Sequence, residues 1–250
     1  MIENTILKAN REGRRALVFS LIFPSLHLVE MAAHVGFEAI SLDGEHGYFS
    51  EQAIDDTCRV ANGYGMSVVA RVPDNSAYQI NLYLDRGIQG VTGPHINSGV
   101  EAQALADACL FPPGGRRSWG GGRGTEFNDD VILNEKYGGK LGFAKWSNQN
   151  MIVVAQIESK QAWDNLDAIL AVKGLTGVTG GPHDFAASLG HPGEPNHKDR
   201  VAATLDADTR ARAAGKTAGG DMSVGTGAAE LMLGVAREFV AKHRKDKVGS

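Results

Sequence analysis

Polar side chains that could take part in chemistry follow short apolar runs at several places in this sequence. Glu158 ends the run that begins at Ile152, and Asp184 follows the run that ends at Gly180. Two carboxylates with few other protein ligands nearby suit Mg²⁺ or Mn²⁺, which prefer oxygen donors and keep water or substrate in their remaining positions. Each carboxylate has an alternative role as a cap of the helix that follows it. The pair predicts a divalent-metal site.

Three further residues could act beside such an ion. His46 follows Asp43 by three residues, and a carboxylate that fixes the tautomer of an imidazole favours a general base near neutral pH. The alternative for His46 is a histidine held in a loop. Arg71 ends another apolar run, where its guanidinium could hold a carbonyl or enolate oxygen or pair with a surface carboxylate. Gln156 lies two residues before Glu158, so both side chains should point to the same face of their strand.

The apolar runs alternate with amphipathic segments, which is the pattern of βαβ units and a parallel sheet. We expect strands at 16–22, 39–43, 67–72, 90–94, 152–158, 175–180 and 216–219, with a weak eighth at 222–225. We expect helices at 25–35, 50–64, 77–86, 100–109, 160–172, 198–214 and 228–243. Such a series favours an α/β chain with one domain over residues 1–250, folded as a TIM (β/α)8 barrel whose carboxyl edge collects the polar residues.

Two segments depart from this pattern. Gly220 and Asp221 leave no room for a helix between the seventh and eighth strands, so the seventh-to-eighth unit of the barrel is abbreviated. Residues 111–128 are rich in glycine and carry three arginines, and a loop of this length is often functional. Its backbone N–H groups could cradle an anion, or the loop could be a lid with incidental arginines. It is no P-loop, because no GK[ST] follows.

Composition restricts the partners and the compartment. The net charge of −4 gives no basic surface for nucleic acid. The longest apolar stretch, 16–23, is too short to span a bilayer. Cys58 and Cys109 lack CxxC spacing, so they form neither a disulfide framework nor a cysteine-based zinc site. We therefore expect a cytoplasmic protein that binds neither nucleic acid nor membrane.

Several motifs, taken in their order along the chain, resemble the HpcH/HpaI family of class II, metal-dependent pyruvate aldolases. This family includes 2-dehydro-3-deoxyglucarate and 4-hydroxy-2-oxoheptanedioate aldolases, and the resemblance runs through most of the chain. It is carried by Asp43-Gly44-Glu45-His46, Arg71, Gly87-Ile88-Gln89-Gly90, Phe111-Pro112-Pro113-Gly114, Gln156-Ile157-Glu158 and Gly181-Pro182-His183-Asp184 leading into Ser188-Leu189-Gly190.

The resemblance implies a TIM barrel in which Glu158 and Asp184 hold Mg²⁺, Mn²⁺ or Co²⁺, and in which pyruvate or a related 2-oxo acid chelates the ion. His46, oriented by Asp43, would help to move the methyl proton, and Arg71 would stabilise the enolate oxygen. The residues expected to contact the substrate are Gln156, Gly181, Pro182, His183 and Gly121. The enolate would add reversibly to an aldehyde, which is the reaction of an aldehyde-lyase.

The resemblance also implies a homohexamer, a trimer of dimers, with the C-terminal helix at about 228–243 exchanged between subunits. The sequence departs from the family pattern at His183, at Gly121 and in the short region 219–225, so aldehyde preference and oligomeric state do not carry over with the motifs. Two other functions stay open. One is a CoA-thioester lyase of the citrate lyase β-subunit or malyl-CoA type, and the other is a barrel that binds a 2-oxo acid without catalysis.

Overall fold

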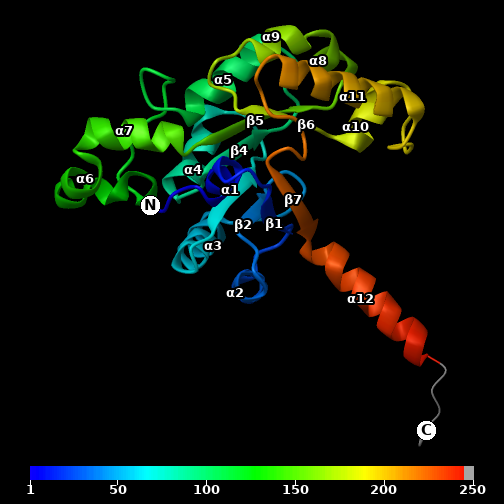
Figure 1. Ribbon diagram of the computed structural model, residues 1–250, viewed down its shortest axis with the longest axis horizontal. Helices are drawn as coiled ribbons and strands as arrows, with labels where there is room; N and C mark the ends of the chain where they lie inside the picture. Colours follow the sequence, from blue (N-terminus) through cyan, green and yellow to red (C-terminus); the bar gives the residue numbers. More distant parts are fainter. Residues whose placement is uncertain (245–250) are drawn as a thin grey trace, which may run out of the picture.

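A single parallel sheet organises the chain in the computed structural model, which describes residues 1–244 (Figure 1). Residues 245–250 of the expected domain lie outside the described residues. The strands are β1 (Ala16–Leu21), β2 (Ala39–Asp43), β3 (Ser67–Arg71), β4 (Gly90–Gly93), β5 (Ile152–Ile157), β6 (Gly177–Gly180) and β7 (Ser223–Gly227). Their order is β6-β5-β4-β3-β2-β1-β7, and each neighbouring pair is parallel. The expected α/β class with a parallel sheet is confirmed.

Helices alternate with these strands along the chain. They are α1 (Thr5–Arg11), α2 (Leu26–Val35), α3 (Glu51–Gly63), α4 (Ala77–Asp85), α5 (Gly99–Cys109), the 3-10 helix η1 (Arg123–Asn128), α6 (Asp130–Tyr137), α7 (Lys140–Gln149), α8 (Lys160–Asp164), α9 (Leu166–Leu170), α10 (Pro182–Ser188), α11 (Lys198–Ala213) and α12 (Ala228–His243). Serine side chains cap α2, α3, α4, α5 and α8 by accepting a hydrogen bond from the first helical turn. None of the helices described in residues 1–244 has the length and apolar composition needed to cross a membrane.

The strands are buried where their side chains meet the surrounding helices. Ile40, Leu42 and Val68 are fully buried between the sheet and the helices, and they belong to the largest apolar cluster. This is the arrangement expected when helices cover a parallel sheet. The core therefore fixes the strand ends, and with them the polar residues that follow each strand.

The curled sheet departs from the expectation at its seventh strand. Residues 216–219 do not form a regular strand: Thr217 makes one parallel bridge with Gly177, and Val178 N–H donates to the Thr217 carbonyl at 2.9 Å. The expected weak eighth strand is the regular one, β7, which pairs with β1. The cause is the short connection: Asp221 N–H donates to the Ala218 carbonyl in a turn, and its carboxylate accepts from Ala218 N–H at 2.9 Å. Among residues 1–244, no ladder joins Thr217 to β7.

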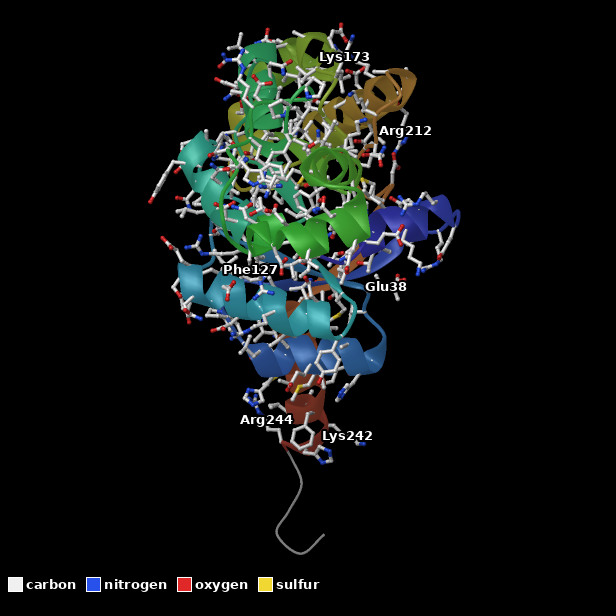
Figure 2. All side chains as sticks on the ribbon, turned by 90° about the vertical axis from the view of Figure 1, so that its left-hand side faces the viewer. Glu38, Phe127, Lys173, Arg212, Lys242 and Arg244 are labelled. Atoms are coloured by element: carbon white, nitrogen blue, oxygen red, sulfur yellow. The ribbon has the colours of Figure 1, made fainter. Side chains whose placement is uncertain are left out.

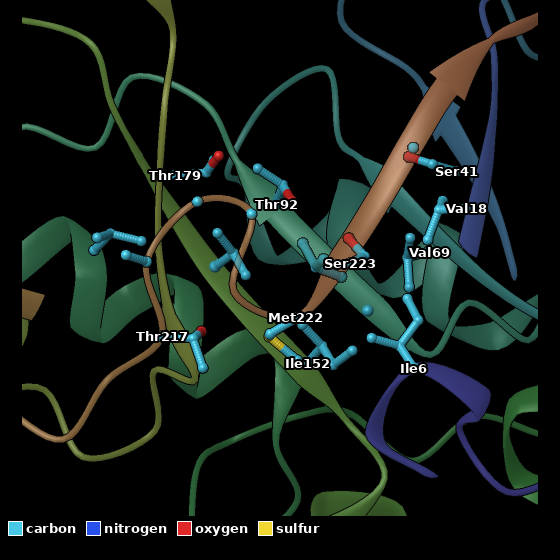
Figure 3. A pocket seen from close by; sticks show the side chains of 18 of the residues that line it. Ile6, Val18, Ser41, Val69, Thr92, Ile152, Thr179, Thr217, Met222 and Ser223 are labelled. Atoms are coloured by element: carbon cyan, nitrogen blue, oxygen red, sulfur yellow. The ribbon is translucent and has the colours of Figure 1, made fainter. Parts of the chain in front are cut away.

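A cavity of about 240 Å³ lies inside the curl of the sheet (Figure 3). Hydroxyl side chains line much of it, namely Ser20, Ser41, Thr92, Thr179, Thr217 and Ser223. Ile6 of α1, Ile152 and Met222 contribute apolar surface. The interior of a TIM barrel is normally filled by layers of bulky branched side chains. Small side chains leave the space inside the curl partly hollow, and in residues 1–244 no helix lies between Thr217 and β7.

Candidate active site

The strand ends bring six polar side chains into one continuous series of contacts. Arg71 ends β3 and lies opposite Asp43, which ends β2. Glu45 and His95 follow β2 and β4, and Gln156 and Glu158 belong to the end of β5. The carboxyl ends of parallel strands meet at one edge of the sheet, where sites of α/β proteins form.

Arg71 and Asp43 form the most fully hydrogen-bonded pair of this series. Nε of Arg71 donates to Oδ1 of Asp43 at 3.0 Å, and Nη2 donates to Oδ2 at 2.6 Å. The same Oδ1 accepts the backbone N–H groups of Glu45 and His46, each at 3.2 Å. Burial alone would raise the pKa of Asp43, but the hydrogen bonds from Arg71 and His46 N–H lower it below its ordinary value. Asp43 is thus an anion that fixes both the guanidinium and the turn after β2.

Glu45 and His95 connect this pair to Glu158. Nη1 of Arg71 lies 2.8 Å from Oε2 of Glu45, an ion pair without hydrogen-bond geometry. Oε1 of Glu45 lies 2.9 Å from Nε2 of His95, and Nδ1 of His95 lies 3.0 Å from Oε1 of Glu158. The His95 imidazole therefore lies between two carboxylates. Neither Glu45 nor His95 was assigned a role from sequence. Glu45 belongs to the motif Asp43-Gly44-Glu45-His46, whereas the position after a strand end was the only signal for His95.

Glu158 is the most deeply buried charged residue of the site, with 2% of its surface exposed. Its Oε1 accepts the His95 backbone N–H at 2.7 Å, and its Oε2 accepts Nε2 of Gln156 at 2.7 Å. Burial raises the pKa of Glu158, the contacts with His95 counteract the rise, and the charges of Glu45 and Asp184 add to it. The expected shared face of Gln156 and Glu158 is borne out by this hydrogen bond.

Asp184 lies at the third position of α10, after Gly181 at the N-cap and Pro182 at the first helical position. Proline favours that position because its missing N–H is not needed there. Asp184 is exposed, and none of the hydrogen bonds or ion pairs found in residues 1–244 involves its carboxylate. Its charge nevertheless raises the pKa of Glu158. The two carboxylates therefore belong to one electrostatic environment.

The structure places His46 differently from the expectation. Its imidazole is 64% exposed, and Nε2 lies 3.9 Å from Oε2 of Glu45. Within the described chain no hydrogen bond joins the ring to Asp43, because the Asp43 carboxylate binds the backbone N–H of His46 and the guanidinium of Arg71 instead. A short acidic side chain readily accepts from backbone groups two or three residues ahead in a tight turn. The expected carboxylate–imidazole pair is replaced by a carboxylate that shapes the turn.

The glycine-rich loop lies against α3 and α4 in this chain. Arg117 is buried over the ring of Phe111, and its guanidinium donates to the carbonyls of Leu84 and Gly124. Arg123 pairs with Asp55 of α3 at 3.4 Å. Gly121 is exposed, and a methyl group added there would lie 3.6 Å from Nδ2 of Asn128. Among the described residues, none of these contacts reaches Glu158 or Asp184, so the arginines anchor the loop and the role of Gly121 stays a prediction.

The carboxylates of the site together have the charge that suits a divalent cation. Asp43, Glu45, Glu158 and Asp184 contribute four carboxylates, while Arg71 is the one permanent cation among these contacts within the described residues. Oε2 of Glu45 is buried without a hydrogen-bond partner. Glu158 is buried and Asp43 and Glu45 are partly buried, and negative charge removed from water is costly unless a cation or protons balance it. Carboxylate oxygens are also the donors that Mg²⁺ and Mn²⁺ prefer.

The HpcH/HpaI aldolase/citrate lyase family model matches residues 15–242. The chain belongs to this family. A 4-hydroxy-2-oxovalerate aldolase of Rhodococcus jostii is 36% identical over 217 residues, which cover 86% of this chain and 80% of that protein. A hydroxypyruvate/pyruvate aldolase of Roseobacter denitrificans is 31% identical over 238 residues, which cover 95% of this chain and 90% of that protein. The resemblance inferred from the motifs is confirmed.

A solved structure shows the same fold. The crystal structure of an HpcH/HpaI aldolase from Desulfitobacterium hafniense aligns with a TM-score of 0.83 and 22% identity, and covers 96% of this chain and 97% of that chain. At this level of identity the likeness concerns the fold. The curled parallel sheet of this chain is therefore that of its family.

The close approach of Gly181 to Glu158 generates a prediction. A methyl group on Gly181 would overlap Oε2 of Glu158 and lie 2.8 Å from Nε2 of Gln156. We expect Gly181→Ala to displace the Glu158 carboxylate and to weaken Mn²⁺ binding by about 10- to 100-fold, the usual cost of disturbing the support of a ligand. Calorimetric titration with Mn²⁺ measures the affinity.

The preceding glycine provides the matched control. A methyl group on Gly180 would meet nothing within 4 Å, so Gly180→Ala should bind Mn²⁺ like the unmodified chain. Equal Mn²⁺ affinity of the two alanine variants would contradict the role of Gly181 as the residue that leaves space for the carboxylate.

Proposed function

We propose that this chain is a metal-dependent aldolase that reversibly adds the enolate of pyruvate or a related short 2-oxo acid to an aldehyde. The observation that carries the proposal is that Asp43, Glu45 and Glu158 surround Arg71 while the charge of Asp184 acts on Glu158, within the residues that the family model matches. The relatives named above are aldolases whose names specify 4-hydroxy-2-oxovalerate, pyruvate or hydroxypyruvate. A short 2-oxo acid is therefore the substrate class that best suits this chain.

Glu158 and Asp184 would hold Mg²⁺, Mn²⁺ or Co²⁺ in this proposal. Glu158 is buried and fixed by His95 and Gln156, whereas Asp184 is exposed and free to turn toward an ion. When bound, the ion supplies Lewis acidity that favours loss of a proton beside the 2-oxo group. Gln156 already donates to Glu158, and its amide would position the substrate beside that ligand.

Arg71 has donors left for the substrate. A guanidinium carries five N–H donors, and Asp43 accepts two of them. The bidentate pair also fixes the plane of the guanidinium, so little side-chain entropy is lost when a substrate oxygen binds. We assign to Arg71 the stabilisation of the enolate oxygen, and to the segment Gly181–His183 the contacts with the substrate carboxylate.

The proton would be moved by His46 in this proposal, with His95 as the competing histidine. The His46 ring is exposed beside Glu45, which leaves its nitrogens accessible to a substrate or a water molecule. The His95 ring is held between Glu45 and Glu158 and would serve to position these carboxylates. Asp43 contributes through the turn that places His46 and through Arg71.

The sheet would act as a (β/α)8 barrel that has lost one helix. Residues around Thr217 would occupy the seventh position beside β6, and β7 would occupy the eighth beside β1. The short turn at Ala218–Asp221 replaces the helix between them. The site at the carboxyl edge is retained because its residues follow strands β2 to β6.

Subunit association would bury the exposed apolar surface of α12. This helix extends away from the remainder of the chain, with Lys242 and Arg244 at its far end (Figures 1 and 2). Met232, Val235 and Phe239 are each at least 65% exposed. Met31 and Val35 of α2 line an apolar groove beside the start of α12. We propose that α12 of a second copy covers this surface within a trimer of dimers.

Proton exchange at pyruvate tests the reaction. We expect the methyl protons of pyruvate to exchange with deuterated buffer when Mg²⁺, Mn²⁺ or Co²⁺ is present, as followed by proton NMR. Glu158→Gln and Asp184→Asn should each slow the exchange by at least roughly a hundredfold, because the electrostatic stabilisation of the enolate is lost. The exposed Asp167, which pairs with Arg210, provides the control Asp167→Asn. Absence of exchange with every ion would contradict the proposal, and exchange with acetyl-CoA alone would indicate the thioester branch.

The same measurement separates the two histidines. His46→Asn should slow the exchange by at least about tenfold at saturating ion, which is the lower end of what general bases contribute. His95→Asn should instead raise the ion concentration needed for half-maximal exchange, because the ring positions Glu45 and Glu158. An unchanged rate in His46→Asn together with lost exchange in His95→Asn would assign the base to His95.

Association through α12 can be measured by sedimentation. We expect a mass that is a multiple of 26.5 kDa, and we expect Met232→Glu combined with Val235→Glu to raise the dissociation constant at least about a hundredfold. Glu238→Gln, a polar change on the same helix, should leave the mass unchanged. A monomeric unmodified chain at micromolar concentration would refute the exchange of α12.

A further inference from the structure

A second group of possible metal ligands lies between α10 and α11. His191, His197 and Asp199 each offer one ligand atom, and these atoms all lie within 4.8 Å of one another. Nε2 of His191 is 3.2 Å and Nδ1 of His197 is 3.7 Å from Oδ2 of Asp199. The two imidazole rings stack, with centroids 3.4 Å apart and planes inclined by 19°. The helices α10 and α11 lie side by side at the edge of the molecule opposite α6 and α7 (Figure 1).

Two of the distances between these atoms are close to the separation of ligand atoms around a tetrahedral ion. Zinc bonds of about 2.0–2.1 Å to nitrogen and oxygen place neighbouring ligand atoms roughly 3.3 Å apart. The two measured separations, 3.2 and 3.7 Å, lie on either side of that value. Because the stacked rings hold their lone pairs in nearly parallel planes, one imidazole has to turn out of the stack before both nitrogens reach the same ion, and the fourth position would then face solvent.

Hydrogen bonds within the loop hold the backbone around these three residues in place. His191 N–H donates to the Ala186 carbonyl at 2.9 Å, and His197 N–H donates to the Glu194 carbonyl at 2.9 Å. Gly190 and Gly193 have φ values of 92° and 81°, which let the chain turn twice between the two helices. The ligands therefore belong to a preformed turn, which lowers the entropy lost when an ion binds.

We propose that His191, His197 and Asp199 bind a first-row transition ion such as Zn²⁺, Co²⁺ or Ni²⁺, apart from the site at the carboxyl edge of the sheet. Imidazole nitrogen favours these ions over Mg²⁺, which prefers oxygen ligands. The ion fastens the end of α10 to the first turn of α11. Asp184 lies near the start of α10, so this second ion steadies the helix that carries it.

His197 already has a structural role that competes with binding of an ion. Nδ1 of His197 accepts the backbone N–H of Asp199 at 3.3 Å as the cap of α11. The ion takes over this lone pair, and the amide then faces solvent. The test therefore leaves His197 unchanged and replaces the other two ligands, so that loss of the cap cannot be mistaken for loss of the ion.

The experiment uses the full chain without an affinity tag, freed of metal with EDTA, in a background that carries Glu158→Gln and Asp184→Asn. This background lacks the two carboxylates of the proposed catalytic ion, so the result does not depend on the aldolase proposal. Calorimetric titration with Zn²⁺ should give one ion per chain, and a large excess of Mg²⁺ should not displace it. Co²⁺ should give a visible absorption spectrum of mixed nitrogen and oxygen ligation.

His191→Asn and Asp199→Asn, each added to this background, should weaken Zn²⁺ binding at least about tenfold. His27→Asn, a change at an exposed histidine of α2, should leave the affinity unchanged. Circular dichroism shows whether each variant is folded. Absence of Zn²⁺ binding in the background variant would overturn the proposal. An affinity that neither His191→Asn nor Asp199→Asn alters would also overturn it.

Discussion

The bidentate ion pair between Arg71 and Asp43 is the interaction on which the carboxyl edge of the sheet depends. It joins the ends of β2 and β3, and the same carboxylate fixes the turn that carries Glu45 and His46. Glu45 in turn contacts His95, and His95 contacts Glu158. Burial would lower the pKa of Arg71, but its hydrogen bonds to Asp43 raise it, so the guanidinium remains the fixed cation of the group.

The sequence was most informative where apolar runs are short and bounded by turns. The strands β2 and β5 and the helix α12 were predicted within one residue of their observed ends. In alternating βαβ units, short apolar runs mark the buried strands and amphipathic segments mark the helices. The helices α1, α6, α7 and α10 were not predicted. Their apolar periodicity is weak or their length is short, and tertiary contacts decide such segments. Asp130–Tyr137, for example, buries one residue, Leu133.

The sequence predicted which residues belong to the site more completely than it predicted the contacts between them. Position at the end of a predicted strand identified Arg71, Gln156 and Glu158, since the strand ends of a parallel sheet must meet. It could not reveal that His95 reaches across to Glu158, because that contact joins residues 63 positions apart through a backbone turn with φ of 52°. Position along the sequence also could not show whether Asp43 binds the side chain or the backbone N–H of His46, since both lie within reach in a turn of four residues.

The short turn that connects Thr217 to β7 affects the cavity inside the sheet more than it affects the candidate active site. Gly177 has no side chain, and a methyl group there would overlap the backbone of Thr217, so the single bridge requires this close approach. The segment around Thr217 is therefore held at the β6 edge of the sheet by backbone contact. The hydroxyl groups that line the cavity can bind water, which makes a partly hollow interior less costly than an apolar one.

On the proposed function, the charges of the site constrain the order of events. Four carboxylates and one guanidinium leave a strong excess of negative charge, which repels a 2-oxo acid because that acid is itself an anion. A divalent cation held by Glu158 and Asp184 would reduce this repulsion and supply Lewis acidity. Under this proposal the substrate would bind together with the ion or after it, and Arg71 would supply further positive charge. The carboxylates would then disfavour an anionic substrate until the cation is bound, so the burial that raises the pKa of Glu158 would also favour binding of the ion.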